Sequence, residues 1–385
     1  MTKNTNFQTN VERGFGQIIE GARIIIKDLY AEGTDVFPRL NYRTGRYDPV
    51  TDYYPMAWDG FPWAGFLAAK LWLIYDYTKE DYFGEHALKI ARKIGPFLSS
   101  NPLPYADAGL ETYYGLCLGY EITGDKELKN WALSAVNNLM ASYKSIPGAF
   151  FQHAEDLVLY IDMPFAAQCF FWAAKWDTKF ADPIIKCNDT ILNSGFIRED
   201  GSTFHAVEFN PNTGEPIKRF TRQGKSEKST WSRGQAWGIH NFTNAYEATR
   251  ESKYFDAALK LTDWYINQIP QDFVPHYDFD DPDIDVIPRD SCSAAIVTNA
   301  LVRIINIKPD LKNKYQNIVQ GTLEEIFKNY LSVGGILLHG SWGRVRKSWN
   351  IGGFPQQDIM PYGNNWIVEV LYRLLQSDWK IYKTI

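Results

Sequence analysis

The sequence predicts an all-α fold, an (α/α)6 toroid in which six inner helices are enclosed by six outer helices, with a small β-hairpin insertion. Three observations support this prediction: a helix pair recurs along the 385 residues, the two helices of each pair differ in polarity, and the two chain ends supply one further helix each. Recurring helical hairpins are typical of repeat architectures. We expect residues 1–385 to form one domain.

The repeated unit is an apolar helix rich in small and aromatic residues, a short polar turn and an amphipathic helix. Five complete units occupy residues 65–94, 109–140, 162–192, 233–269 and 291–327. The last apolar helix, residues 362–375, has no partner after it, and the amphipathic helix of residues 11–31 has none before it. Pairing these two ends makes a sixth pair and closes the ring. An open superhelical solenoid of the same hairpins is the competing architecture.

The composition excludes several classes of function. A net charge of −5 without a long basic run argues against nucleic acid as a partner. The four cysteines and six histidines are dispersed, without CxxC or HExxH, so we expect buried thiols, no metal and no cofactor. No apolar run reaches the roughly 18 residues of a membrane span. The polar start MTKNTNFQTN predicts a cytoplasmic protein, or a periplasmic one if a leader has been removed. We expect a monomer or weak homo-oligomer.

Four aspartates open predicted inner helices: Asp59, Asp107, Asp162 and Asp290. Because all inner helices run in the same direction, their first residues meet at one end of the ring and surround one funnel on its axis. Each aspartate has a simple alternative role, since Asp is a favoured N-cap. Carboxylates that converge also perturb each other's pKa, which general acid catalysis near neutral pH requires. Asp107 and Asp162, on consecutive inner helices, form the natural pair.

The stretch STWSRGQAWG, residues 229–238, places Arg233 between Trp231 and Trp237. These indoles, like Trp58 and Trp63 before the first inner helix, either fill space between helices or cover the apolar face of a sugar ring. The guanidinium of Arg233 either bonds a helix end or an acid of the protein, or matches a substrate carboxylate. Several aromatic residues around one funnel favour a carbohydrate ligand.

A β-hairpin is predicted over residues 204–224, FHAVEFNPNTGEPIKRFTRQG, because two alternating runs flank an Asn/Gly/Pro turn. Pairing across this turn brings His205 and Gln223 near one another and next to residues 229–238. A lone histidine is more often structural. Beside Gln223 and Arg233, however, His205 is a candidate site residue.

The order of these residues resembles that of the unsaturated glucuronyl hydrolases over nearly the whole chain. The resemblance rests on Asp107, Asp162, His205, the TRQG segment with Gln223, the WSRGQAWG segment and the late pair Tyr362–Gly363. The related unsaturated rhamnogalacturonyl hydrolases match this stretch less well. Two positions depart from the family pattern: Ala106 and Met163 stand where the family often has His and Asn.

This resemblance implies a catalytic domain that acts on short oligosaccharides left by polysaccharide lyases, which end in a 4,5-unsaturated uronic acid. Asp162 matches the acid that protonates C4 and then activates the water that adds to C5. Asp107 matches the second acid, which contacts ring hydroxyls and tunes the first. The implied substrate-binding residues are His205, Gln223, Trp231, Arg233, Trp237, Tyr362 and one of Trp58 and Trp63. The implied partner is an unsaturated uronate-containing di- or oligosaccharide from chondroitin, hyaluronan, heparin, gellan or ulvan.

Three other functions fit parts of the pattern. An inverting glycosidase on the same ring requires a well-separated acid and base, and cleaves saturated glycans. A non-catalytic toroid that binds glycans predicts a funnel without a desolvated acid. A sugar epimerase would need paired histidines in the funnel, and the scattered histidines argue against it.

Overall fold

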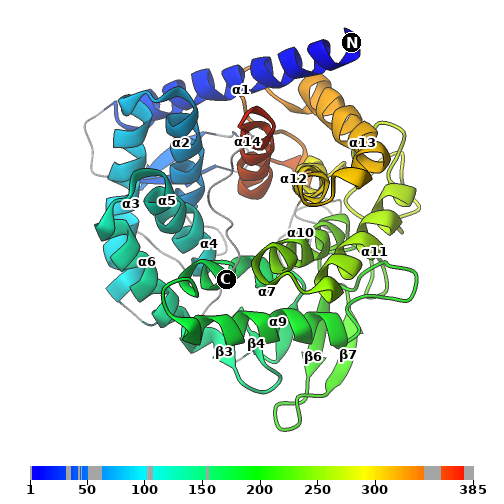
Figure 1. Cartoon of the computed structure of the whole chain (residues 1–385). Coiled ribbons are helices and arrows are strands. Elements are labelled where there is room, and N and C mark those ends of the chain that lie inside the picture. The colour runs from blue at the N-terminus through cyan, green and yellow to red at the C-terminus, as the bar shows by residue number, and fades with distance from the viewer. Residues whose placement is uncertain are drawn as a thin grey trace.

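The computed structural model describes residues 2–31, 36–41, 44, 46–50, 63–100, 102, 107–152, 156–341 and 357–376. Within them, the chain forms a ring of helix pairs, an (α/α)6 toroid (Figure 1). Two residues from the sequence analysis, Trp58 and Asp59, lie outside the described residues.

The predicted helix pairs are confirmed, and the first helix of each complete pair lies on the inside of the ring (Figure 1). The inner helices are α2 (Ala64–Thr78), the run of α4 (Ala108–Glu111), η1 (Thr112–Cys117) and α5 (Leu118–Thr123), then α7 (Met163–Ala166) with α8 (Cys169–Ala173), α10 (Ser232–Thr249), α12 (Ser291–Ile307) and α14 (Pro361–Leu375). The outer helices are α1 (Thr2–Leu29), α3 (Asp81–Ser100), α6 (Lys126–Leu139), α9 (Ala181–Asn193), α11 (Ser252–Gln268) and α13 (Lys312–Glu325). Short helical turns extend or connect them: η2 (Met140–Ser142), η3 (Thr178–Phe180), η4 (Pro309–Leu311) and η5 (Ile326–Tyr330).

Burial explains the difference in polarity between the two layers. Every residue of α2 from Ala64 to Ile74 is buried, and so is every residue of α12 from Ser291 to Ile304. The outer helix α3 buries only one side, which includes Phe83, Ala87 and Ile90. A helix enclosed by neighbours must be apolar nearly all round, whereas an outer helix needs one apolar face only.

The two chain ends close the ring. Helix α1 packs along α14 and also contacts α2 and α13 (Figure 1). Its buried side includes Val11, Phe15 and Ile18, and the Phe15 ring meets the Tyr77 ring of α2 edge to face at a centroid distance of 5.0 Å. Contact between the first helix and the last excludes the open solenoid.

The predicted hairpin is confirmed. Strand β6 (Ala206–Phe209) pairs antiparallel with β7 (Pro216–Phe220), with a register shift at Glu208/Phe209. A third strand, β5 (Val158–Tyr160), pairs with the other edge of β6. Strand β5 was not predicted, since three residues are too few to show an alternating pattern. This strand ends two residues before Asp162, so it fixes the approach of the chain to that residue.

Three further two-stranded ribbons occur in the described residues. They are β1 (Phe37–Leu40) with β2 (Tyr47–Val50), β3 (Tyr143–Lys144) with β4 (Ala149–Phe150), and β8 (Gly340–Ser341) with β9 (Gln357–Asp358).

The four cysteines are buried free thiols, as predicted: Cys117, Cys169, Cys187 and Cys292. In the described part of the chain, no group of three or more His, Cys, Asp or Glu side chains is placed to hold a metal ion. Of the helices in these same residues, none is both long and apolar enough to cross a membrane.

Candidate active site

Two predicted acids open adjacent inner helices. Asp107 directly precedes α4, and Asp162 directly precedes α7. The two helices approach closely because position 109 is a glycine: a Cβ on Gly109 would lie 1.9 Å from the carbonyl oxygen of Ala166. Only a residue without a side chain permits this contact. Gly109 therefore helps to bring the starts of the two helices, and with them the two carboxylates, close together.

Neither of these carboxylates caps its helix. No side-chain capping hydrogen bond forms at Asp107 or Asp162 in the described structure. Asp290, in contrast, caps α12 by accepting from the backbone N–H groups of Cys292 and Ser293 at 3.1 and 3.3 Å. Capping, the simpler interpretation of all three aspartates, therefore holds for Asp290 and leaves the other two available for chemistry.

The environment of Asp162 favours its protonated form. Its Oδ1 atom is buried and has no hydrogen-bond partner among the described residues. Burial, and next the nearby carboxylate of Asp107, raise the pKa of Asp162 to about 7, although Arg233 and Arg222 oppose the shift. Asp107 is itself held by Gln152, whose Nε2 donates to its Oδ2 at 2.5 Å. An acid with a pKa near neutrality is suited to proton transfer.

The hairpin holds the backbone beside Asp162. The N–H of Ile161 donates to the carbonyl oxygen of His205 at 2.9 Å. The imidazole of His205 in turn accepts at Nδ1 from the backbone N–H groups of Arg222 and Gln223, at 3.4 and 3.3 Å. The sequence prediction that His205 and Gln223 lie near one another is therefore confirmed.

His205 is neutral and presents a donor. Burial, followed by the charges of Arg222 and Arg233, lowers the pKa of His205 to about 3. Because Nδ1 accepts hydrogen bonds, the single proton of the neutral ring lies on Nε2. The ring stands next to those of Tyr160 and Trp231, at centroid distances of 5.1 and 4.7 Å. His205 can therefore donate a hydrogen bond to a ligand, but it is a poor base near neutral pH.

Arg233 pairs with an acid of the protein. Its Nη1 donates to Oδ2 of Asp290 at 2.9 Å and also to the carbonyl oxygen of Ser341. The guanidinium carbon lies 4.7 Å from the centre of the Trp231 ring, and the Arg233 residue is 1% exposed. Of the two partners considered for Arg233 in the sequence analysis, the structure shows the acid, which ties the start of α10 to the start of α12.

The aromatic side chains expected to stack on a sugar are packed against other side chains of the inner helices. Trp231 and Trp237 are each 1% exposed, and Trp237 stacks on Phe165 with ring centroids 4.1 Å apart. Tyr362, which is half-buried, meets the edges of Trp237 and Trp63 at 5.6 and 5.2 Å. Of the two roles considered for these indoles, the described contacts show packing between helices. Their contact with a sugar stays a prediction.

Comparison with known proteins identifies the family. The chain is 30% identical over 349 residues to an unsaturated chondroitin disaccharide hydrolase of Streptococcus pneumoniae, covering 86% of this chain and 85% of that protein. A protein of the same description from Streptococcus pyogenes is 30% identical over 347 residues, 84% of each chain. The chain belongs to the unsaturated glucuronyl hydrolase family. The resemblance found in the sequence is thus confirmed, although no family model matches the chain.

The fold agrees with that of a solved unsaturated glucuronyl hydrolase. The structure of the enzyme from Streptococcus agalactiae superposes with a TM-score of 0.84 at 24% identity, covering 98% of this chain and 94% of that one. This similarity covers nearly the whole chain and shows that the two proteins share the fold. The family is one of glycoside hydrolases, so this chain is a hydrolase.

The structure places at the site four residues that were not predicted from the sequence: Gln152, Tyr160, Arg222 and Asn241. Tyr160 and Arg222 each lie within two residues of a predicted residue along the chain, which was an available signal. Gln152 reaches Asp107 from a loop, and Asn241 donates from the middle of α10 to the carbonyl oxygen of Ile161 at 2.6 Å. No sequence pattern marks these two, because their roles depend on tertiary contacts.

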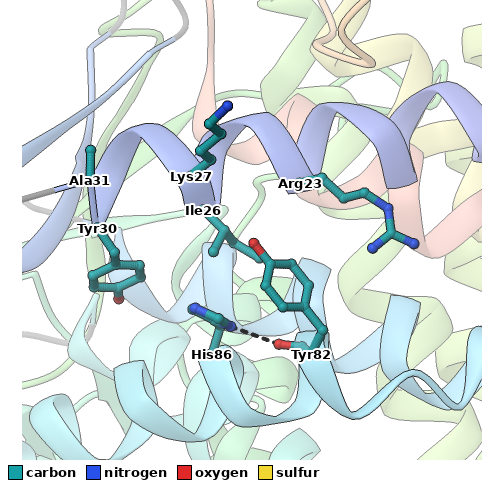
Figure 2. A pocket seen from close by; sticks show the side chains of 7 residues that line it. All are labelled: Arg23, Ile26, Lys27, Tyr30, Ala31, Tyr82 and His86. Atoms are coloured by element: carbon teal, nitrogen blue, oxygen red, sulfur yellow. Dashed lines mark hydrogen bonds between the residues drawn. The ribbon is translucent and has the colours of Figure 1, made fainter. Parts of the chain in front are cut away.

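A groove on the outer surface lies between α1 and α3 (Figure 2). Tyr30, Tyr82 and His86 line it, and Nδ1 of His86 lies 2.7 Å from the carbonyl oxygen of Tyr82. Arg23, also in its lining, is bound by both carboxylate oxygens of Glu80, at 2.8 and 2.6 Å. None of the predicted site residues lines this groove. The candidate active site therefore remains at the starts of the inner helices.

Proposed function

We propose that this chain removes the 4,5-unsaturated uronic acid from the non-reducing end of lyase-generated oligosaccharides, and that residues 1–385 act as one catalytic domain. One observation carries the proposal: the buried carboxyl of Asp162, with a pKa of about 7 beside Asp107, lies at a helix start of the family's ring. A non-catalytic glycan-binding toroid would have no use for a desolvated acid there.

The first step is proton transfer to carbon. The carboxyl of Asp162 donates its proton to C4 of the vinyl ether, and the electron pair of the double bond forms the new C–H bond. Positive charge develops on C5 and is shared with the ring oxygen. The carboxylate left on Asp162 and the nearby Asp107 stabilise this charge in a site that excludes much of the water.

The second step is addition of water. The Asp162 carboxylate takes a proton from a water molecule while the water oxygen bonds to C5, which restores the starting acid. The product is a hemiketal at C5, which opens to a ketone and leaves the ring oxygen as a hydroxyl on C1. The hemiacetal thus formed at C1 collapses to an aldehyde and releases the glycosidic oxygen as an alcohol. One water is consumed and one glycosidic bond is lost. The Nε2–H of His205 and the side chain of Gln223 are the donors that we assign to substrate hydroxyls.

An inverting glycosidase is the alternative reaction on this ring. It requires an acid and a separate base on opposite faces of the anomeric carbon. The hydration mechanism needs one carboxyl that serves in turn as acid and base, and the raised pKa of Asp162 fits this role. We therefore favour hydration of the double bond over displacement at the anomeric carbon.

The test follows the double bond itself. Unsaturated chondroitin disaccharide is the first substrate to use, since the curated relatives are named for it. Loss of the ultraviolet absorbance of the conjugated double bond is expected with the wild type and not with Asp162→Asn. The matched saturated disaccharide should remain intact. Cleavage of the saturated sugar would instead establish a glycosidase, and stable absorbance over a panel of uronate disaccharides would reject the proposal.

A further inference from the structure

Arg222 is an exposed cation in contact with the proposed active site. It lies in the loop that follows β7, and its Nη1 donates to the phenol oxygen of Tyr160. The guanidinium carbon is 5.5 Å from the centre of the Tyr160 ring. The backbone N–H of Arg222 is also one of the two donors to Nδ1 of His205. The side chain and the backbone of Arg222 are thus both fixed beside Asp162.

Arg222 and Arg233 both influence the acid, but they differ in accessibility. Each lowers the pKa of Asp162 and of His205. Arg233 is buried in its ion pair with Asp290, whereas Arg222 is exposed to solvent. An exposed guanidinium can exchange water for an anionic ligand, and the bond to Tyr160 holds the planar fork in one orientation, which lowers the entropy cost of binding.

The charge of the protein and of the proposed substrate explains why an exposed cation would be needed at the site. The whole chain carries a net charge of −5, and the proposed substrate ends in a uronate. Two carboxyl groups, Asp107 and Asp162, open the helices at the site. Without a local cation that faces solvent, an anionic sugar would approach a site and a protein of its own sign.

We propose that Arg222 is a substrate-binding residue whose guanidinium pairs with an anionic group of the bound saccharide, a uronate carboxylate or a sulfate ester, and that Tyr160 orients it. The proposal rests on the function proposed above. The alternative is that Arg222 only ties the hairpin to β5, through Tyr160.

The test compares two arginines of the same hairpin. Arg222→Met removes the proposed contact, and Arg219→Met removes the same charge from β7, where Nε donates to the carbonyl oxygen of Ser194 at 2.9 Å. Arg222→Met should raise KM about tenfold with little change in kcat, the effect of losing one charge-assisted hydrogen bond. Arg219→Met should leave KM near the wild-type value. Tyr160→Phe should give an intermediate KM, since it keeps the charge but frees its orientation.

The unsaturated disaccharide is assayed with and without a sulfate ester. A rise in KM for both forms identifies the carboxylate as the partner, and a rise for the sulfated form alone identifies the sulfate. Because Arg222 lowers the pKa of Asp162, Arg222→Met should also move the alkaline limb of kcat/KM to higher pH. Loss of the charge produces that shift in either role, so the KM values decide between substrate binding and a purely structural contact.

Equal KM values for Arg222→Met and wild type with both substrates would overturn the proposal, as would an equal rise in Arg219→Met. Binding of the same disaccharides to Asp162→Asn, measured by calorimetry with and without Arg222→Met, separates this inference from the proposed reaction. Turnover of the double bond by the wild type tests the reaction. The loss of affinity on removing Arg222 tests the contact, even if the wild type were inactive.

Discussion

At the scale of single residues, Asp162 and Asp290 occupy equivalent positions, each directly before an inner helix, but their carboxyl groups have different partners. Burial raises the pKa of both. Asp290 accepts from two backbone N–H groups and from Arg233, all of which stabilise the carboxylate. Oδ1 of Asp162 has no such donor in the described structure, and its neighbour Asp107 is another acid. Only Asp162 is therefore placed to hold and transfer a proton near neutral pH.

The pH dependence of the reaction follows from this difference. The acid form of Asp162 starts the reaction, so kcat/KM should be highest below its pKa of about 7 and decline as pH rises through that value. His205, with a pKa of about 3, stays neutral over this range and adds no limb near neutrality. Initial rates between about pH 5 and 9 check the prediction. A rate that increases from pH 6 to 8 would mean that the reaction requires a base first.

At the scale of elements, the buried pair of Arg233 and Asp290 joins the starts of α10 and α12. Arg233→Ala leaves Asp290 as an unpaired buried charge, and we expect the free energy of unfolding to fall by about 3–5 kcal/mol. The double variant Arg233→Met with Asp290→Leu should recover much of this loss, since it removes both charges. Urea unfolding measures both effects.

Substrate binding by the same double variant separates the two roles of Arg233. A stable protein that still binds the unsaturated disaccharide with wild-type affinity would show that Arg233 is structural. A double variant that regains stability but binds the disaccharide more weakly than the wild type would instead support the contact between Arg233 and the substrate carboxylate that the family resemblance implies.

Asn241 links α10 to the residue before Asp162. Its Nδ2 donates to the carbonyl oxygen of Ile161, whose N–H is held by His205. Asn241→Leu should therefore displace Asp162 and lower kcat roughly tenfold to hundredfold, as small misplacements of catalytic groups do. Asn188→Leu is the matched control, because buried Asn188 makes a similar bond from Nδ2 to the carbonyl oxygen of Ile184 at 2.9 Å in α9.

Both leucine variants should lose about 0.5–3 kcal/mol of stability, since each removes a buried side-chain hydrogen bond to a carbonyl oxygen. Only Asn241→Leu should lose activity in steady-state assays of the folded protein. Equal kcat in the two variants would show that the position of Asp162 does not depend on Asn241.

The elements show what the sequence can and cannot predict. Helix pairs are long, and their apolar periodicity repeats, so the ring and its inner and outer layers follow from the pattern. The hairpin follows from its turn residues, and it places His205 beside Gln223 as expected. Strand β5 and the partners Gln152 and Asn241 are not predictable in this way. They depend on contacts between segments far apart in the chain, and nothing in their own sequence marks them.

At the scale of the whole molecule, the two ends of the chain meet and close the ring. Helix α1 supplies the outer half of the pair that α14 begins, and buried residues such as Val11, Phe15 and Ile18 complete the core there. The rest of α1 is positioned by close backbone contact. A Cβ on Gly21 would lie 1.9 Å from the carbonyl oxygen of Gly334. Backbone atoms cannot move aside as a flexible side chain can, so this glycine sets the distance at which the closing helix packs.

Two glycines of α1 therefore give opposite predictions for the same substitution. Gly21→Ala should destabilise the protein by about 1–3 kcal/mol, because the added methyl group forces the closing helix away from Gly334. Gly16→Ala should stabilise it by about 0.4–1 kcal/mol, since a Cβ there meets nothing within 4 Å and alanine restricts the unfolded chain. Urea midpoints of the two variants check both signs. If Gly21→Ala unfolded at the wild-type midpoint, the contact between α1 and the segment at Gly334 would tolerate displacement, and this close approach would contribute less to stability than the packing implies.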